Sequence, residues 1–264
     1  MSGDRLRVAL VTQEEPFYLP PAVEDFCRGC RDELVGLIIL PAFNESRWKN
    51  AQRLYEFFGP VDFSRLVWRF GWAKVLDRLN GVRPVTRPFS AHDVARRHDV
   101  RVLEPAKINS AEFVELLRNE VRPDLLVSIA ASQILKQRVL DVPRLGCINL
   151  HSAPLPRYQG MMPNFWTMMH GEPEAAVTVH YMVEKLDAGD IVLQKAVPIH
   201  PSDSLHDLMI RSKKIGVEAL LEAIDLIRAG QVKPKPMDAS QATYFSFPKR
   251  ADAQKLRQRG HPLL

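Results

Sequence analysis

Short apolar segments that alternate with helix signals constrain the fold of this chain most strongly. Arg7–Thr12 and Leu34–Leu40 are apolar runs of strand length, and the segment Pro20–Cys27 between them has prolines in its first helical turn. A strand, a helix and a second strand in this order form a β-α-β unit, which joins parallel strands by a right-handed crossover. The sequence therefore predicts an α/β protein with an open, mostly parallel, Rossmann-like sheet and helices on both faces.

The same alternation continues along the chain. Further strands are expected over residues 99–103, 124–130, 146–150, 177–182 and 191–199. Helices are expected from a capping box at Asn109–Glu112 to Asn119, after Pro163 as far as Gly171, and from Ser204 to Gly230. We therefore predict one large unit over residues 1–200, and a C-terminal helix with a short basic extension over 201–264.

Residues 41–97 interrupt this pattern with a crowd of aromatic side chains. We expect a helical insertion there whose aromatic residues pack on the sheet edge. A cap over a substrate mouth or a surface for a homodimer is the alternative, because aromatic side chains are enriched in both. A second aromatic patch, Tyr244–Phe247, is also a candidate dimer surface.

Charge and hydropathy exclude several classes of protein. The 264 residues include 36 Lys and Arg against 31 Asp and Glu, a net charge of +5. No run reaches the roughly 20 apolar residues that cross a membrane, and the charged start Met1–Arg7 does not resemble a signal peptide. A cytoplasmic protein without a membrane partner is expected. Because the basic residues are scattered, nucleic acid is the less favoured partner, although the basic tail leaves it open.

The cysteines and the first loop exclude two kinds of cofactor site. Cys27 and Cys30 form a CxxC pair, but only Cys147 remains, whereas structural zinc sites take four ligands. His200 and His206 have no convincing third ligand, so we expect no metal and two reduced thiols. The loop after the first strand lacks a GxGxxG motif, which disfavours a dinucleotide.

The candidate catalytic residues lie between residues 146 and 194. Asn149 and His151 lie at the carboxyl end of an expected strand, where open sheets bind ligands, and residues two apart in a strand point the same way. The turn Leu186–Asp190 adds carboxylates. An amide and a protonated imidazole can stabilise an oxyanion, and a nearby carboxylate would raise the pKa of His151 and could take up a proton. For Asp190, a role in stabilising the turn is favoured over a role in the chemistry.

No side chain in this region has the setting of a nucleophile. Ser152 lacks the G-x-S-x-G elbow, so direct transfer between two bound substrates is favoured over a covalent enzyme intermediate. His180 alternates with the apolar side chains of its strand, and its place at the site stays open.

Several motifs in this region resemble the formyltransferase family. They are Gly146–His151, the proline-rich rim Pro154–Gly160, Gly171-Glu172, Val177–His180 and Leu186–Asp190. The family uses N10-formyltetrahydrofolate and includes glycinamide ribonucleotide, methionyl-tRNA and sugar-nucleotide formyltransferases. The resemblance is strongest over residues 120–200 and weaker before residue 119, and it implies that residues 1–200 are a formyltransferase-like catalytic domain with that family's fold.

The resemblance also implies roles for individual residues. It assigns the catalytic asparagine, histidine and aspartate to Asn149, His151 and Asp187. It places the folate against two loops, at Ala131, Ser132, Gln133, Ile134 and Leu135, and at Val183 and Leu186. The implied reaction is attack of a primary amine on the formyl carbon through a tetrahedral intermediate, with Asp187 keeping His151 charged.

Departures from the family's pattern bear on the acceptor. Gln159 stands where many members have an arginine, which removes a possible contact to an anionic acceptor. About 60 residues follow the last core strand, fewer than the C-terminal barrel domain of the tRNA enzymes needs. We therefore expect a small-molecule amine as the acceptor. Methionyl-tRNA formylation and hydrolysis of the folate are alternatives, although the known hydrolases carry an extra N-terminal domain. A folate- or RNA-binding protein without activity is the alternative outside enzymes.

Overall fold

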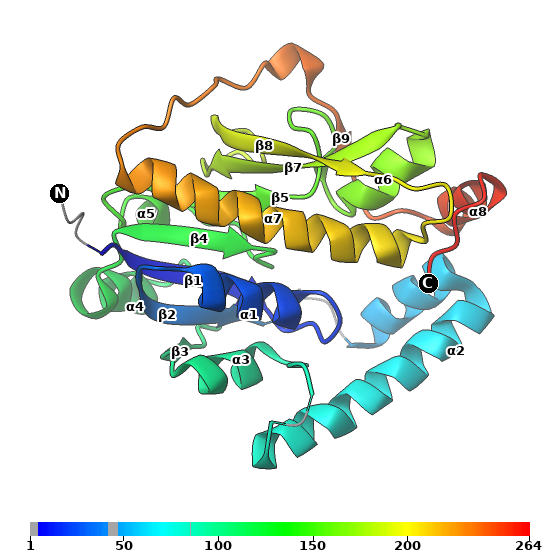
Figure 1. Cartoon of the computed structure of the whole chain (residues 1–264), viewed down its shortest axis with the longest axis horizontal. Helices are drawn as coiled ribbons and strands as arrows, with labels where there is room; N and C mark the ends of the chain where they lie inside the picture. The colour runs from blue at the N-terminus through cyan, green and yellow to red at the C-terminus, as the bar shows by residue number, and fades with distance from the viewer. Residues whose placement is uncertain (1–4, 42–46, 85) are drawn as a thin grey trace.

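A seven-stranded open sheet organises the chain, as the computed structural model shows for residues 5–41, 47–84 and 86–264 (Figure 1). Its strand order is β3-β2-β1-β4-β5-β7-β8. The strands are β1 (Arg7–Gln13), β2 (Glu33–Leu40), β3 (Val102–Leu103), β4 (Leu125–Ile129), β5 (Cys147–His151), β7 (Glu174–Tyr181) and β8 (Ile191–Pro198). The first five are parallel, and β7 and β8 run antiparallel to their neighbours. The predicted open, mostly parallel α/β fold is confirmed.

Helices cover both faces of this sheet. One face carries α1 (Leu19–Gly29), α3 (Ala91–His98), α6 (Pro163–His170) and α7 (Leu205–Arg228). The other carries α4 (Ala111–Leu116) and α5 (Gln137–Leu140). Alternate residues of β1 supply the two cores: Val8 and Leu10 face the first set of helices, and Ala9 and Val11 face the second.

The C-terminal segment returns to the sheet rather than leaving it. The helix α7, capped by Ser204 and Asp207, packs on β5, β7 and β8. Beyond it, the 3-10 turn η2 (Ala239–Gln241) precedes β9 (Tyr244–Phe245), which pairs with β6 (Gln159–Gly160), and the helix α8 (Arg250–Gln258) packs against α6. The tail therefore forms part of the rim that follows β5.

Some predicted boundaries are wrong. The strand expected over residues 99–103 is only Val102–Leu103, because Asp99 takes a left-handed conformation that ends α3. The cap of α4 is Ser110, which accepts the Phe113 amide, and not Asn109. Instead, the Asn109 side chain holds the backbone of Ile134 and Lys136, and α4 passes into a π-helical turn, η1 (Leu117–Val121).

The insertion is helical, as expected, but its packing differs from the prediction. The helix α2 (Arg47–Val82) bends at Gly59 and runs outside the layers of the sheet, against α8 and α3 (Figure 1). Phe57 is buried against Phe165 and Phe247, whereas Trp48, Trp68 and Trp72 are 78%, 70% and 55% exposed. Most aromatic residues of α2 therefore do not pack on the sheet edge. Residues 42–46 and 85 of the insertion, and residues 1–4 of the start, lie outside the described residues.

Candidate active site

The polar side chains predicted at residues 149–190 meet at the carboxyl end of β5. Asn149 and His151 stand on the same side of β5 and pair in register with His180 and Thr178 of β7. The turn between β7 and β8 brings Asp187 over them. The His151 Nδ1 atom lies 3.6 Å from one Asp187 carboxylate oxygen, and the His180 Nε2 atom lies 3.8 Å from the same oxygen. The three residues that the sequence singled out therefore share one site, and His180 joins them.

His151 is held from both sides. Its Nε2 atom donates a hydrogen bond to the Tyr158 carbonyl oxygen at 2.8 Å, which fixes the ring. Its Nδ1 atom faces Asp187 at a separation too long for a direct hydrogen bond. His151 is 6% exposed and Asp187 is 7% exposed. A proton on Nδ1 would therefore be stabilised by the carboxylate and still be able to donate to a bound oxygen.

His180 orients the amide of Asn149. The His180 Nδ1 atom donates to the Tyr181 carbonyl oxygen at 2.8 Å, so its Nε2 atom accepts from the Asn149 amide at 3.2 Å. Burial lowers the pKa of His180 to about 4, the nearby His151 lowers it as well, and Asp187 opposes the shift. The neutral ring keeps one Asn149 N–H occupied and leaves the other for a ligand.

Asp187 is positioned by the rim that follows β5. Its second carboxylate oxygen accepts the Gly160 amide at 3.0 Å, and its carbonyl oxygen accepts from the Gln159 side chain at 2.8 Å. Asp187 has a φ of 49°, in the left-handed region that costs a non-glycine residue about 1 kcal/mol or more. Gly160 has a φ of 96°, and a Cβ there would overlap the Phe245 carbonyl oxygen, so only glycine fits.

Gln159 and Asp190, two rim and turn residues singled out from the sequence, have structural contacts. The Gln159 side chain is buried and points at the Asp187 backbone, so it is not available to an acceptor. Asp190 is exposed and receives the Tyr181 amide on its carbonyl oxygen. The aromatic patch of the tail also supports the rim, because Phe245 stacks on Tyr158 with ring centroids 5.5 Å apart.

The residues expected to meet the folate lie on two neighbouring loops. The amide of Gln137, just after the loop that follows β4, donates to Glu184 at 2.9 Å and so joins the loops. Ser132 and Gln133 use their side chains within the protein, on Pro41 and on Ile108 and Ala106. Leu135 is buried in the core, whereas Ile134, Val183 and Leu186 are 58%, 45% and 43% exposed. Ala131 is partly buried against the second core, so Ile134, Val183 and Leu186 offer the most exposed apolar surface of this set.

A second polar cluster, which the sequence reasoning missed, lies after β1. Glu15 accepts the amides of Phe17, Tyr18 and Leu19 at the start of α1, and burial raises the pKa of this carboxyl. Burial also lowers the pKa of Lys213, near Glu15, to about 8. The place of Glu15 directly after an apolar parallel strand was the available signal.

His206 links this second cluster to α2. Its Nε2 atom accepts from Arg69 at 2.9 Å, so its Nδ1 atom donates to the Tyr18 hydroxyl at 2.8 Å. Burial lowers the pKa of His206, which agrees with a neutral ring. The contact fixes α2 against the first turn of α7.

The cysteines and the candidate ligands do not form a metal centre. Cys27, Cys30 and Cys147 are free thiols, and burial raises the pKa of Cys27 to about 12. Across residues 5–41, 47–84 and 86–264, no group of three or more metal-ligating side chains comes together. Over the same residues, none of the helices is both long and apolar enough to span a bilayer.

Comparison with known proteins places this fold and site in a class. A family model described as formyl transferase matches residues 73–224, which include β4, β5, β7, β8 and most of α7. The chain belongs to the formyl transferase family. A methionyl-tRNA formyltransferase of Geobacter sulfurreducens is 38% identical over 176 residues, 67% of this chain and 55% of that protein. The chain thus spans about half the length of the curated relatives it matches.

Solved structures show the same fold at low sequence identity. A phosphoribosylglycinamide formyltransferase from Anaplasma phagocytophilum aligns with a TM-score of 0.61 at 16% identity, over 93% of this chain and 100% of that chain. A sugar 3N-formyl transferase, solved in the presence of dTDP and 5-N-formyl-THF, aligns with a TM-score of 0.58 at 17% identity, over 92% and 70% of the two chains.

Proposed function

We propose that this protein transfers a formyl group from N10-formyltetrahydrofolate to a primary amine of a small molecule. The observation that carries the proposal is the cluster of Asn149, His151 and Asp187, in which the His151 Nδ1 atom and one Asn149 N–H remain for a ligand oxygen. Membership of the formyl transferase family and the folate in a structural relative support the donor.

In this mechanism the amine attacks the formyl carbon directly. The carbonyl oxygen becomes an oxyanion, and the free Asn149 N–H and the His151 Nδ1–H donate to it. Because both donors are already in position, they need not reorganise as the negative charge develops on the oxygen. The Tyr158 carbonyl and His180 keep both donors in place. Collapse of the tetrahedral intermediate breaks the bond from that carbon to N10, and tetrahydrofolate leaves after N10 takes up the proton that the amine gives up.

Asp187 has two roles, one toward the charge of His151 and one toward the proton of the attacking amine. Its carboxylate stabilises the positive charge on His151, and it can receive, directly or through water, the proton that the attacking amine releases. The exposed apolar side chains Ile134, Val183 and Leu186 would contact the pterin. Ser132, Gln133 and Leu135 would shape that loop rather than touch the ligand, because their side chains are already engaged.

Methionyl-tRNA is the second candidate acceptor. Curated relatives at 38% and 42% identity are methionyl-tRNA formyltransferases, which favours it. Structures of sugar and glycinamide ribonucleotide enzymes align with nine-tenths of this chain, which favours a small amine. The site geometry serves either acceptor, since the attacking group is a primary amine in both.

The test is release of tetrahydrofolate from N10-formyltetrahydrofolate, followed by absorbance. One arm holds a mixed pool of small amines, a second holds charged initiator tRNA, and a third holds no acceptor. Release only with the pool supports the proposal, and mass spectrometry then names the formylated product. Release only with tRNA supports the second candidate, and release without acceptor indicates a hydrolase. Failure to bind folate at all would refute the family's activity for this chain.

A further inference from the structure

The outward face of the second half of α2 is an apolar stripe that the described part of the chain leaves largely exposed. Its residues follow one another at helical spacing: Val61, Trp68, Trp72, Val75, Leu79 and Val82. Each is at least 44% exposed, and Val82 is 91% exposed. The rings of Trp68 and Trp72 lie parallel, 6.4 Å apart. Soluble proteins rarely expose apolar side chains in one continuous row of this length, and such rows usually mark a contact surface.

A neighbouring side of the same helix contacts the rest of the protein. Ala73 and Asn80 are buried there, and Asn80 donates to Asp93 of α3 at 3.1 Å. Arg69 reaches His206 at 2.9 Å. These contacts set the rotation of the helix and keep Trp68 and Trp72 pointing outward.

The exposed charged side chains beside the stripe are mainly basic. Between residues 61 and 83 the basic side chains are Arg65, Arg69, Lys74, Arg78 and Arg83. The acidic ones are Asp62 and Asp77, and both are half-buried and paired. Asp62 pairs with Arg257 at 2.9 Å and with Arg65 at 3.3 Å, and Asp77 accepts from Ser90 at 2.7 Å. The stripe is therefore flanked by net positive charge.

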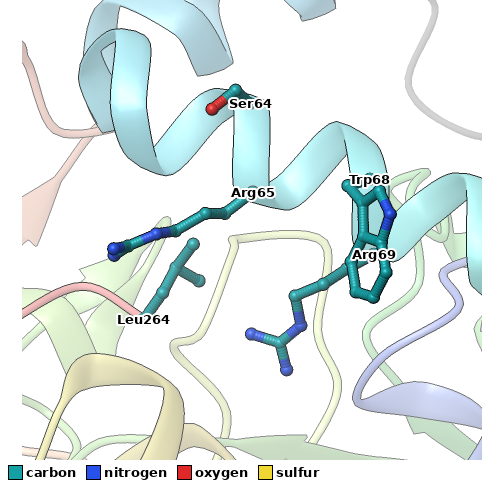
Figure 2. A pocket seen from close by; sticks show the side chains of 5 residues that line it. All are labelled: Ser64, Arg65, Trp68, Arg69 and Leu264. Atoms are coloured by element: carbon teal, nitrogen blue, oxygen red, sulfur yellow. The ribbon is translucent and has the colours of Figure 1, made fainter.

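A cavity beside the stripe combines the same two features. It has a volume of about 510 Å³ and is lined by Ser64, Arg65, Trp68, Arg69 and Leu264 (Figure 2). Arg65 and Arg69 leave α2 on the side where Leu264 lies, next to the Trp68 ring (Figure 2). Guanidinium groups beside an indole and an aliphatic side chain suit a phosphate whose attached group is apolar.

From these observations we propose that the stripe docks on an anionic lipid bilayer, with α2 lying flat in the interface. Helices that do so carry Trp and aliphatic residues on one face and Lys or Arg beside it. The expectation of no membrane partner rested on the lack of a spanning segment, which a helix lying in the interface does not need. This proposal does not depend on the acceptor or on formyl transfer.

Two other occupants fit the same surface less well. In a symmetric dimer a second copy would bring the arginine flanks of the two stripes together, at a cost in repulsion. RNA would match the charge and could stack on Trp68 or Trp72, but the aliphatic rest of the stripe, Val61, Val75, Leu79 and Val82, offers no ring on which a base could stack.

The experiment is sedimentation of the whole protein with vesicles. One set is an equimolar mixture of phosphatidylglycerol and phosphatidylcholine, and the other is phosphatidylcholine alone. We expect binding to the anionic vesicles that falls at least tenfold in 0.5 M salt. The double variant Trp68→Ser with Trp72→Ser should bind at least tenfold more weakly. The control Trp48→Ser, exposed on the first half of α2, should bind as the unchanged protein does.

A second measurement, fluorescence quenching, uses a variant that still binds lipid. In the Trp48→Phe variant, lipids brominated near the headgroup should quench Trp68 and Trp72 emission, while buried Trp166 keeps its emission. No binding to anionic vesicles, or equal binding to both sets, would overturn the proposal. A concentration-dependent dimer abolished by the double variant would assign the stripe to a second copy, and tRNA binding lost in the double variant would assign it to RNA.

Discussion

The candidate active site and the second half of α2 place polar and apolar groups in opposite ways. At the site, polar side chains are buried: His151, His180 and Asp187 are 6%, 2% and 7% exposed, and each has a partner. On α2, Trp68 and Trp72 are exposed, and their rings lie parallel 6.4 Å apart. Both arrangements cost folding free energy, because burial of polar groups and exposure of apolar ones are unfavourable.

The two regions differ in whether their contacts lie inside the protein or with an outside partner. The site is stabilised within the protein by hydrogen bonds, so a change there is felt in both stability and chemistry. The α2 stripe has no partner within the described part of the chain, so a change there should be felt only when its occupant is present. Substitutions in the two regions can therefore separate internal from external contacts.

The largest expected effect is that of Asp187→Asn on turnover. Loss of the charge beside His151 should lower kcat by about 10²- to 10³-fold while the folate Kd changes less than threefold, because the carboxylate acts on charge that develops in the transition state. Steady-state kinetics and folate titration check this. The matched control is Asp190→Asn on the same turn, which should keep at least half of kcat. Equal losses in kcat and folate affinity would contradict the role.

His180 should make the protein sensitive to acid. Its folded pKa of about 4 lies below the ordinary value of 6.5, so the unfolded chain binds a proton first as the pH falls. Stability is retained above pH 6.5 and decreases between pH 6.5 and 4, by up to roughly 3 kcal/mol. Urea unfolding at several pH values should show this decrease, and His180→Gln should reduce it. An identical pH dependence in the variant would remove His180 as the cause.

Gly160→Ala tests whether the rim positions Asp187. The left-handed φ and the overlap with Phe245 should cost about 2 kcal/mol of stability and shift the amide that holds the Asp187 carboxylate. Chemical denaturation measures the first effect and kcat the second. Gly230→Ala is the control: its φ is also positive, at 64°, but a Cβ there meets nothing within 4 Å. Unchanged kcat for Gly160→Ala would show that the rim does not set the turn.

The smallest expected effect is that of Trp72→Ser on stability without lipid. Because its side chain is exposed, the free energy of unfolding should stay within about 0.5 kcal/mol of the unchanged protein. The buried Phe57→Ala change on the same helix should instead cost about 3 kcal/mol or more. Denaturation curves of the two variants give the contrast directly. A large loss for Trp72→Ser would mean that the stripe packs within the protein after all.

The sequence alone determined the class of fold and predicted three members of the candidate site. Apolar runs of strand length located β1, β2, β4 and β5, because a buried parallel strand needs apolar side chains on both faces, and period-2 alternation located β7. The motif order gave Asn149, His151 and Asp187 by resemblance, and strand geometry put the first two on one side. These are local properties, readable from neighbours in the chain.

The tertiary structure decided what depends on contacts between distant segments. His180 joins the site because β7 pairs in register with β5, and Gln159 turns inward because the rim meets the 186–190 turn. The direction of the α2 aromatic residues followed from Arg69 on His206 and Asn80 on Asp93, not from their spacing. Periodicity shows that a helix has an apolar face, but only the contacts of its other face decide whether that face is buried.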